Sequence, residues 1–198
     1  MNIVESFQNG PKKKGAFLSR VFGIFNEEIV RIWARDPQSP YSISDRRPTL
    51  YDKSGQYTLD FLFTKDGYSY VSEMKCEIQY QNYKYWMLED ASQLEHHRGK
   101  RAFELFLDVA KDPASINVRA GSEVKPSGAI LVWGAVSPNG AKSVQDLFGI
   151  SDVLAVEDCM RDLLRWGNSD YRELITEKKD WCNELYRTLL GSAGNNDI

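Results

Sequence analysis

Residues 57–78 read YTLDFLFTKDGYSYVSEMKCEI, and this stretch decides the fold. Two runs rich in Tyr, Phe, Val and Ile, residues 57–64 and 68–78, lie on either side of the dipeptide Asp66-Gly67. Runs of this composition are typical of β-strands, and Asp-Gly is a favoured two-residue turn between antiparallel strands. The sequence therefore predicts a β-hairpin that turns at Asp66-Gly67.

The turn also predicts the register of the hairpin. If Asp66-Gly67 is the loop, Lys65 pairs with Tyr68, and counting away from the turn sets Asp60 opposite Glu73. Opposed side chains have Cβ atoms about 5 Å apart, where two like charges repel each other. Asp60 also stands in an apolar run, where a buried carboxylate needs a partner. We therefore expect a cation or a shared proton between these two carboxylates.

Lys75 completes this group of charged side chains. Glu73 and Lys75 point to the same face because side chains alternate along a strand. Carboxylate oxygens suit Mg²⁺ or Mn²⁺, and a neighbouring lysine helps to orient or deprotonate the attacking water. The pattern predicts a metal site for phosphodiester hydrolysis. The alternative is a solvent-facing hairpin with ordinary surface charge, which accounts for Glu77 but not for Asp60.

The segments around the hairpin alternate between helical and strand patterns. Apolar spacing predicts helices over residues 16–34, about 85–111 with a kink or break at Gly99, roughly 151–166 and about 170–190. A short strand is expected near residues 49–52, a loop over 114–127 and a buried strand over 128–136. This order predicts an α/β protein, with a mixed central sheet flanked by helices and a helical C-terminal extension.

We expect one core with three appended segments. A mobile basic arm covers residues 1–14, the core covers 15–140, a helical lobe packed on the core covers 141–191, and a flexible tail covers 192–198. The long helical lobe outside the core leads to the hypothesis of a homodimer that forms through the C-terminal helices.

The bulk composition is that of a globular protein. Of the 198 residues 42% are hydrophobic and 27% are charged, and the net charge is −3. Proteins that coat nucleic acid are usually basic, so contacts with DNA would come from local clusters such as Arg31 with Arg35. The apolar runs are too short to span a bilayer. Three scattered cysteines favour reduced thiols, and we expect a cytoplasmic protein without a membrane partner.

The hairpin motif resembles that of the PD-(D/E)xK nuclease superfamily, which includes many restriction endonucleases, resolvases and RecB-like exonucleases. The match is Leu59-Asp60, twelve intervening residues, and Glu73-Met74-Lys75. Leu59 stands where the motif's name has proline. The similarity covers roughly residues 16–136 and implies a restriction-endonuclease-like core with the element order αβββαβ.

The resemblance implies a role for each matching residue. Asp60 and Glu73 are expected to bind Mg²⁺ or Mn²⁺, with the backbone carbonyl of Met74 as a further ligand. Lys75 is expected to be the catalytic lysine. These roles agree with those that the register of the hairpin suggests.

The family often adds a glutamate from the first helix, and two candidates stand there. Glu28 shares a helix face with Phe25 and Ile32, so it borders the apolar stripe and leans toward the sheet, whereas Glu27 points further out. We choose Glu28 as the additional catalytic carboxylate, and the alternative is that both are solvated.

RecB-like members of the family carry Gln-x-x-x-Tyr on the helix after the lysine strand. Here Gln93 and His97 have that spacing, with histidine in place of tyrosine. On one helix they would share a face with Lys100 and Arg101, and these four side chains are the expected contacts to substrate phosphate.

Together these features predict a Mg²⁺-dependent endodeoxyribonuclease that hydrolyses phosphodiester bonds in DNA. The resemblance implies a setting in restriction, phage defence or repair. Two alternatives stay open. One is a catalytically inactive nuclease-fold module that binds nucleic acid or protein, and the other is an RNA-directed nuclease, because the chemistry of the site does not distinguish the sugars.

Overall fold

A five-stranded sheet forms the centre of the computed structural model, which describes residues 11–76 and 87–191. The strand order is β1-β4-β5-β9-β11. β4 runs antiparallel to its neighbours β1 and β5, whereas β9 runs parallel to its neighbours β5 and β11. The predicted mixed central sheet is confirmed. Its strands are β1 (Ser42–Ile43), β4 (Phe61–Lys65), β5 (Tyr68–Lys75), β9 (Gly128–Trp133) and β11 (Asp152–Ala155).

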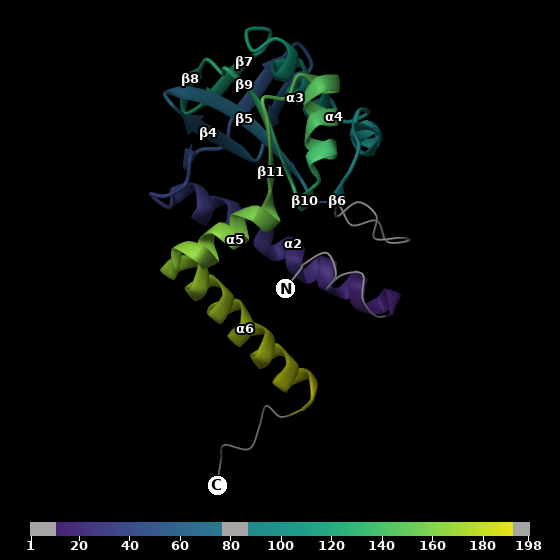
Figure 1. The fold of residues 1–198 in the computed structure, drawn as a ribbon, viewed down its shortest axis with the longest axis vertical. Coiled ribbons are helices and arrows are strands. Elements are labelled where there is room, and N and C mark those ends of the chain that lie inside the picture. Colours follow the sequence, from purple (N-terminus) through teal and green to yellow (C-terminus); the bar gives the residue numbers. More distant parts are fainter. Residues whose placement is uncertain (1–10, 77–86, 192–198) are drawn as a thin grey trace.

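A second, four-stranded antiparallel sheet has the order β3-β2-β7-β8, and β7 and β8 lie far from the C-terminus in Figure 1. The prediction of a loop over residues 114–127 is therefore wrong, because these residues form a short hairpin that turns at Gly121. The four strands and a separate parallel pair are β2 (Thr49–Asp52), β3 (Gly55–Thr58), β7 (Asn117–Ala120) and β8 (Ser122–Val124), with β6 (Met87–Leu88) beside β10 (Ala135–Val136).

The predicted continuous strand over residues 57–64 is also wrong. Its first part is β3 in the second sheet and its last part is β4 in the central sheet, so the chain changes sheet at Leu59 and Asp60. Tyr57 pairs with Leu50 of β2, whereas Phe61 pairs with Ser72 of β5. Asp60 therefore stands at the junction of the two sheets.

Helices cover both faces of the central sheet (Figure 1). On one face α3 (Arg101–Lys111) and α4 (Pro138–Phe148) pack against β5 and β9, and on the other α2 (Lys12–Arg35) and α5 (Val156–Trp166) do so. All six residues of β9 are buried, as expected for a strand that is covered on both faces. No helix in the described part of the chain is long and apolar enough to cross a membrane.

Two predicted helices differ in their bounds. The helix expected over residues 85–111 is a 3-10 helix, η1 (Ala91–His97), followed by α3, so the predicted break at Gly99 is confirmed. The helix expected from residue 151 begins at Val156, because residues 152–155 form β11 beside β9. The C-terminal lobe is therefore not purely helical, since it supplies a strand to the central sheet.

The ends of the chain are described only in part. Lys12 begins α2, so the last residues of the expected basic arm are helical, while residues 1–10 and the expected tail lie outside the described residues. Residues 77–86, where the lysine strand and the next helix were expected to end and begin, also lie outside them. α6 (Ser169–Leu189) has the predicted extent and reaches away from the sheets toward the C-terminus (Figure 1).

Candidate active site

The hairpin of β4 and β5 has the predicted register. Lys65 pairs with Tyr68, and the ladder continues to Phe61 and Ser72. Asp66 and Gly67 have φ angles of 52° and 81°, which is the left-handed pair of conformations that a tight hairpin turn requires. This end of the hairpin is confirmed, pair by pair, up to the residue next to Asp60.

Asp60 departs from the simple ladder. Its amide donates a hydrogen bond to the carbonyl of Ser72 at 3.1 Å, although Ser72 is already paired with Phe61. Two residues of one strand thus face one residue of the other, as in a β-bulge. The expected direct opposition of Asp60 and Glu73 is therefore wrong. The Asp60 carboxylate instead reaches along β5, where Oδ2 accepts a hydrogen bond from the Met74 amide at 2.8 Å.

Glu73 and Lys75 lie on the same face of β5 and form an ion pair. Glu73 is only 8% exposed, and burial raises the pKa of its carboxyl group, while the positive charge of Lys75 lowers it. The negative charge of Asp60 raises this pKa as well, and the positive charge of Lys100 lowers it. The two carboxylates are therefore close enough to interact, and Lys75 does not fully compensate the buried charge of Glu73.

The donors around this pair fit Mg²⁺ or Mn²⁺. Both carboxylates offer oxygen, and the carbonyl of Met74 lies on the strand between Glu73 and Lys75. In the described residues no group of three or more His, Cys, Asp and Glu side chains is gathered as for a metal ion. Mg²⁺ often takes one or two protein carboxylates and keeps several waters, so a two-carboxylate site suits it better than it suits zinc.

Of the expected phosphate contacts, Lys100 has a charge that lowers the pKa of Glu73, and the other three have different surroundings. The side-chain oxygen of Gln93 accepts hydrogen bonds from the amides of Glu89 and Asp90, so that it caps η1. His97 is fully buried, with its ring centroid 5.3 Å from that of Phe103. The four residues do not share one helix face, because the chain breaks between η1 and α3.

Arg101 turns toward the second sheet. Its Nε and Nη2 atoms donate to one carboxylate oxygen of Asp52 on β2, at 2.8 and 2.5 Å, and Nη1 pairs with Glu104. Arg101 is therefore held at β2, away from the hairpin that carries Glu73.

The two glutamates of the first helix also have partners. Glu28, our choice from the sequence, lies 3.5 Å from Lys178 on α6, whereas Glu27 forms an ion pair with Arg47. Glu28 thus faces the C-terminal helix rather than the hairpin. Glu27 lies one helical turn before Arg31, which contacts Asp60, and its charge raises the pKa of Arg31.

Sequence reasoning missed the role of Arg31. This side chain on α2 donates from Nη2 to the carbonyl oxygen of Asp60 at 3.1 Å, and its guanidinium carbon lies 5.1 Å from the centroid of the Phe61 ring. The sequence offered one signal, the basic cluster of Arg31 with Arg35 on the first helix, but it gave no reason to connect Arg31 with the hairpin.

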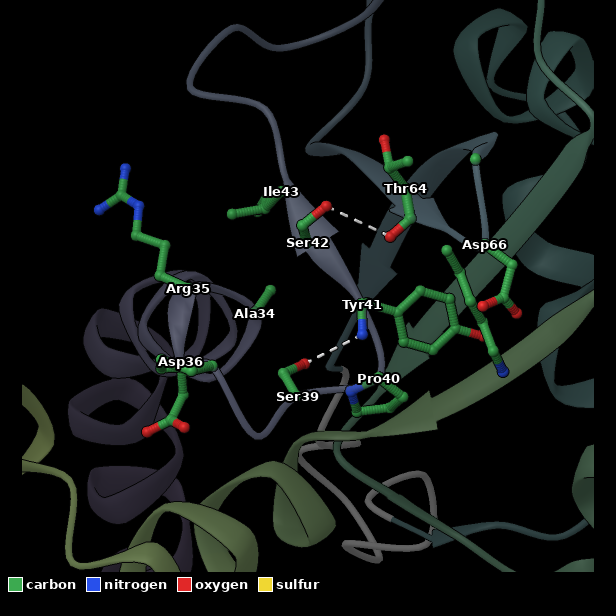
Figure 2. A pocket seen from close by; sticks show the side chains of 13 residues that line it. Ala34, Arg35, Asp36, Ser39, Pro40, Tyr41, Ser42, Ile43, Thr64 and Asp66 are labelled. Atoms are coloured by element: carbon green, nitrogen blue, oxygen red, sulfur yellow. Dashed lines mark hydrogen bonds between the residues drawn. The ribbon is translucent and has the colours of Figure 1, made fainter.

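A pocket of about 550 Å³ lies at the other end of the hairpin. It is bounded by the end of α2, the segment before β1 and the turn at Asp66 (Figure 2). Tyr41 lines it, and its hydroxyl donates to Asp152 at 2.5 Å. This pocket lies at the turn, whereas Asp60 lies at the open end of the hairpin, so the two features are separate.

Comparison with protein-family models, with curated proteins and with solved structures finds no significant match to this chain.

Proposed function

We propose that this protein is a Mg²⁺-dependent nuclease that hydrolyses phosphodiester bonds in DNA. The observation that carries the proposal is the group of Asp60, Glu73 and Lys75 at the open end of one hairpin. Two interacting carboxylates, one of them buried, and an adjacent lysine are the functional groups that such a reaction needs.

The order of the elements supports the proposal. The elements α2, β1, β4, β5, α3 and β9 follow one another as helix, three strands, helix and strand. Inserted between them are β2 and β3 after β1, β6 and η1 after β5, and β7 and β8 after α3. The strands of this series are neighbours in the order β1-β4-β5-β9. This series agrees with the αβββαβ order that the family resemblance implies, with Asp60 directly before its second strand and Glu73 and Lys75 on its third.

The electrostatics of the site favour a polyanionic substrate. Lys75 pairs with Glu73, Lys100 lies close enough to lower the pKa of Glu73, and Arg31 contacts the backbone of Asp60. The net charge of the chain is −3, so this positive charge is local. Together with a bound cation, these basic side chains would attract a ligand of negative charge, here the phosphates of a nucleic acid.

Each residue then has a distinct task. Asp60 and Glu73 supply oxygen donors, and the Met74 amide orients the Asp60 carboxylate. Lys75 holds Glu73 and adds positive charge next to the scissile phosphate. When bound, the divalent cation stabilises the developing negative charge and lowers the pKa of water. The three cysteines are free, which agrees with a reducing cytoplasm, and restriction, phage defence or repair is the setting implied by the family resemblance.

The test is a cleavage assay on supercoiled plasmid, single-stranded DNA and RNA, with and without Mg²⁺ or Mn²⁺. We expect cation-dependent cleavage of DNA that is lost in Asp60→Ala and Lys75→Ala and kept in Lys65→Ala, a control at the turn of the same hairpin. Failure of the wild-type protein to cleave any of the three would contradict the proposal. Binding without turnover would identify a non-enzymatic module, and cleavage of RNA alone an RNA-directed enzyme.

We further propose that α6 joins two copies of the chain. Its residues Cys182, Leu185 and Leu189, beyond Lys178, which pairs with Glu28 of the same chain, have the spacing of a coiled-coil seam. Leu185 is 55% exposed and Leu189 72% exposed, and α6 extends beyond the rest of the fold (Figure 1). A second copy of the same seam would cover these side chains.

A further inference from the structure

Arg31 reaches from α2 to the point where the chain enters β4. Its Nη2 atom donates to the carbonyl oxygen of Asp60 at 3.1 Å, and its guanidinium carbon lies 5.1 Å from the centroid of the Phe61 ring. A planar guanidinium can stack on a ring and donate in its own plane at the same time, which lysine cannot do. One side chain thus contacts both Asp60 and Phe61, the first residue of β4.

The contact matters because Asp60 lies outside the ladder of the central sheet. β4 begins at Phe61, so Asp60 has no ladder partner of its own in the central sheet. Its amide donates to Ser72, its carboxylate accepts from the Met74 amide, and its carbonyl accepts from Arg31. Two of these bonds come from β5. The third comes from the helix layer on the opposite side of the chain.

The position of Arg31 also has an electrostatic cost. Burial lowers the pKa of its guanidinium, and the neighbouring charge of Arg47 lowers it further, whereas Glu27 raises it. Arginine stays protonated in spite of such shifts. Partial burial near a second arginine therefore disfavours the charged form of Arg31. The hydrogen bond to Asp60 and the stacking on Phe61 offset this electrostatic cost.

We propose that Arg31 is a positioning residue, which fixes the backbone of Asp60 so that its carboxylate is held beside Glu73 for cation binding. This inference rests on the proposed function. Fixing the peptide groups on both sides of Asp60 fixes the position from which its carboxylate reaches the Met74 amide. Residues that orient a metal ligand typically contribute 10- to 100-fold in affinity.

The test compares Arg31→Met, which keeps the apolar stem, with Arg31→Lys, which keeps the charge but cannot stack and donate together. Arg35→Met is the matched control, because Arg35 lies one turn further along α2 and pairs only at the surface with Asp45, at 2.7 Å. Affinity for Mn²⁺ is obtained from the rise in melting temperature with Mn²⁺ concentration, and kcat and KM are measured on plasmid DNA.

We expect about tenfold weaker Mn²⁺ binding in Arg31→Met, about threefold weaker binding in Arg31→Lys, and no change in Arg35→Met. The loss in kcat should follow the same order, with KM for DNA unchanged. Wild-type Mn²⁺ affinity in either folded Arg31 variant would overturn the inference. Absence of any Mn²⁺-dependent stabilisation in the wild-type protein would instead contradict the proposed function, so the two failures are distinguishable.

Discussion

The Asp60 carboxylate accepts a hydrogen bond from the Met74 amide at 2.8 Å, which ties the residue between the two sheets to the strand that carries Glu73 and Lys75. The bond gives Asp60 a structural role in addition to its proposed role as a ligand. Substitutions at this position therefore need to separate the two.

Asp60→Ala and Asp60→Asn are expected to separate them. Alanine removes the acceptor and leaves the Met74 amide without it, so the free energy of unfolding should fall by about 1–3 kcal/mol. Asparagine retains an acceptor oxygen and should cost less, yet both variants should lose the stabilisation by Mn²⁺. Urea denaturation with and without Mn²⁺ measures both effects. Equal stability of the two variants would show that the Met74 bond contributes little.

Lys75→Met is expected to abolish cleavage without weakening the binding of Mn²⁺. Lys75 donates to Glu73 and is not itself an oxygen donor, so its loss leaves both carboxylates available. We expect a fall in kcat on the order of 10²- to 10⁴-fold, the usual contribution of a group that assists proton transfer. Plasmid cleavage and Mn²⁺-dependent melting measure the two properties. Cleavage by this variant at the wild-type rate would exclude Lys75 from the reaction.

Glu73 is expected to make stability depend on pH. Burial raises its pKa in the folded state above the ordinary value of 4.5, although Lys75 opposes the shift. The folded protein therefore binds more protons than the unfolded one between these two pKa values, and the free energy of unfolding should fall as pH rises through that window. Above the folded pKa this contribution is constant.

Glu73→Gln removes this titration. As pH rises above about 4.5, the wild type should lose stability and Glu73→Gln should not, so the variant should become more stable relative to the wild type. Urea denaturation at a series of pH values measures both free energies of unfolding. Glu123→Gln, at an exposed residue of β8, is the control. A difference that is independent of pH would contradict the shift.

Gln93→Ala is expected to affect folding rather than substrate binding. The side-chain oxygen accepts from the amides of Glu89 and Asp90 at 2.7 and 2.9 Å, and Nε2 donates to the carbonyl of Met87 at 3.0 Å. Loss of a helix cap costs about 0.5–2 kcal/mol. Thermal denaturation should show that loss, and DNA affinity measured by fluorescence anisotropy should stay the same. Weaker DNA binding at unchanged stability would restore Gln93 as a substrate contact.

Leu185→Lys is expected to separate the proposed dimer. It places a charge in the apolar seam of α6, whereas Asn183→Lys makes the same change of charge at an exposed polar residue of the same helix. Sedimentation velocity should give a dimer for the wild type and for Asn183→Lys, and a monomer for Leu185→Lys. A wild-type monomer at all concentrations would contradict the association.

The hairpin register was predictable because a local signal determines it. Asp66-Gly67 favours a two-residue turn, and each pair then follows from the one before, as far as Phe61 and Ser72. The break at Leu59-Asp60 was not predictable, since residues 57–64 read as one apolar run and only distant partners, Leu50 for Tyr57, assign its two halves to different sheets.

The contribution of the first helix was harder to predict for the same reason. Periodicity shows which face of α2 is apolar, but it does not show which element covers each side of that face. Lys178 of α6 lies beside Glu28, and the carbonyl of Asp60, directly before β4, accepts a hydrogen bond from Arg31. β11 was missed because residues 152–155 directly precede a helical pattern, and they become a strand only beside the free edge of β9.

The hairpin has its chemistry at one end and its turn at the other, with five residue pairs between Asp60 and Asp66-Gly67. Both turn residues are exposed and lie outside the paired strands. A foreign peptide or a small recognition module inserted between Asp66 and Gly67 would leave the bonds around Asp60 in place. The turn is therefore the natural grafting point for redirecting this protein to a chosen target.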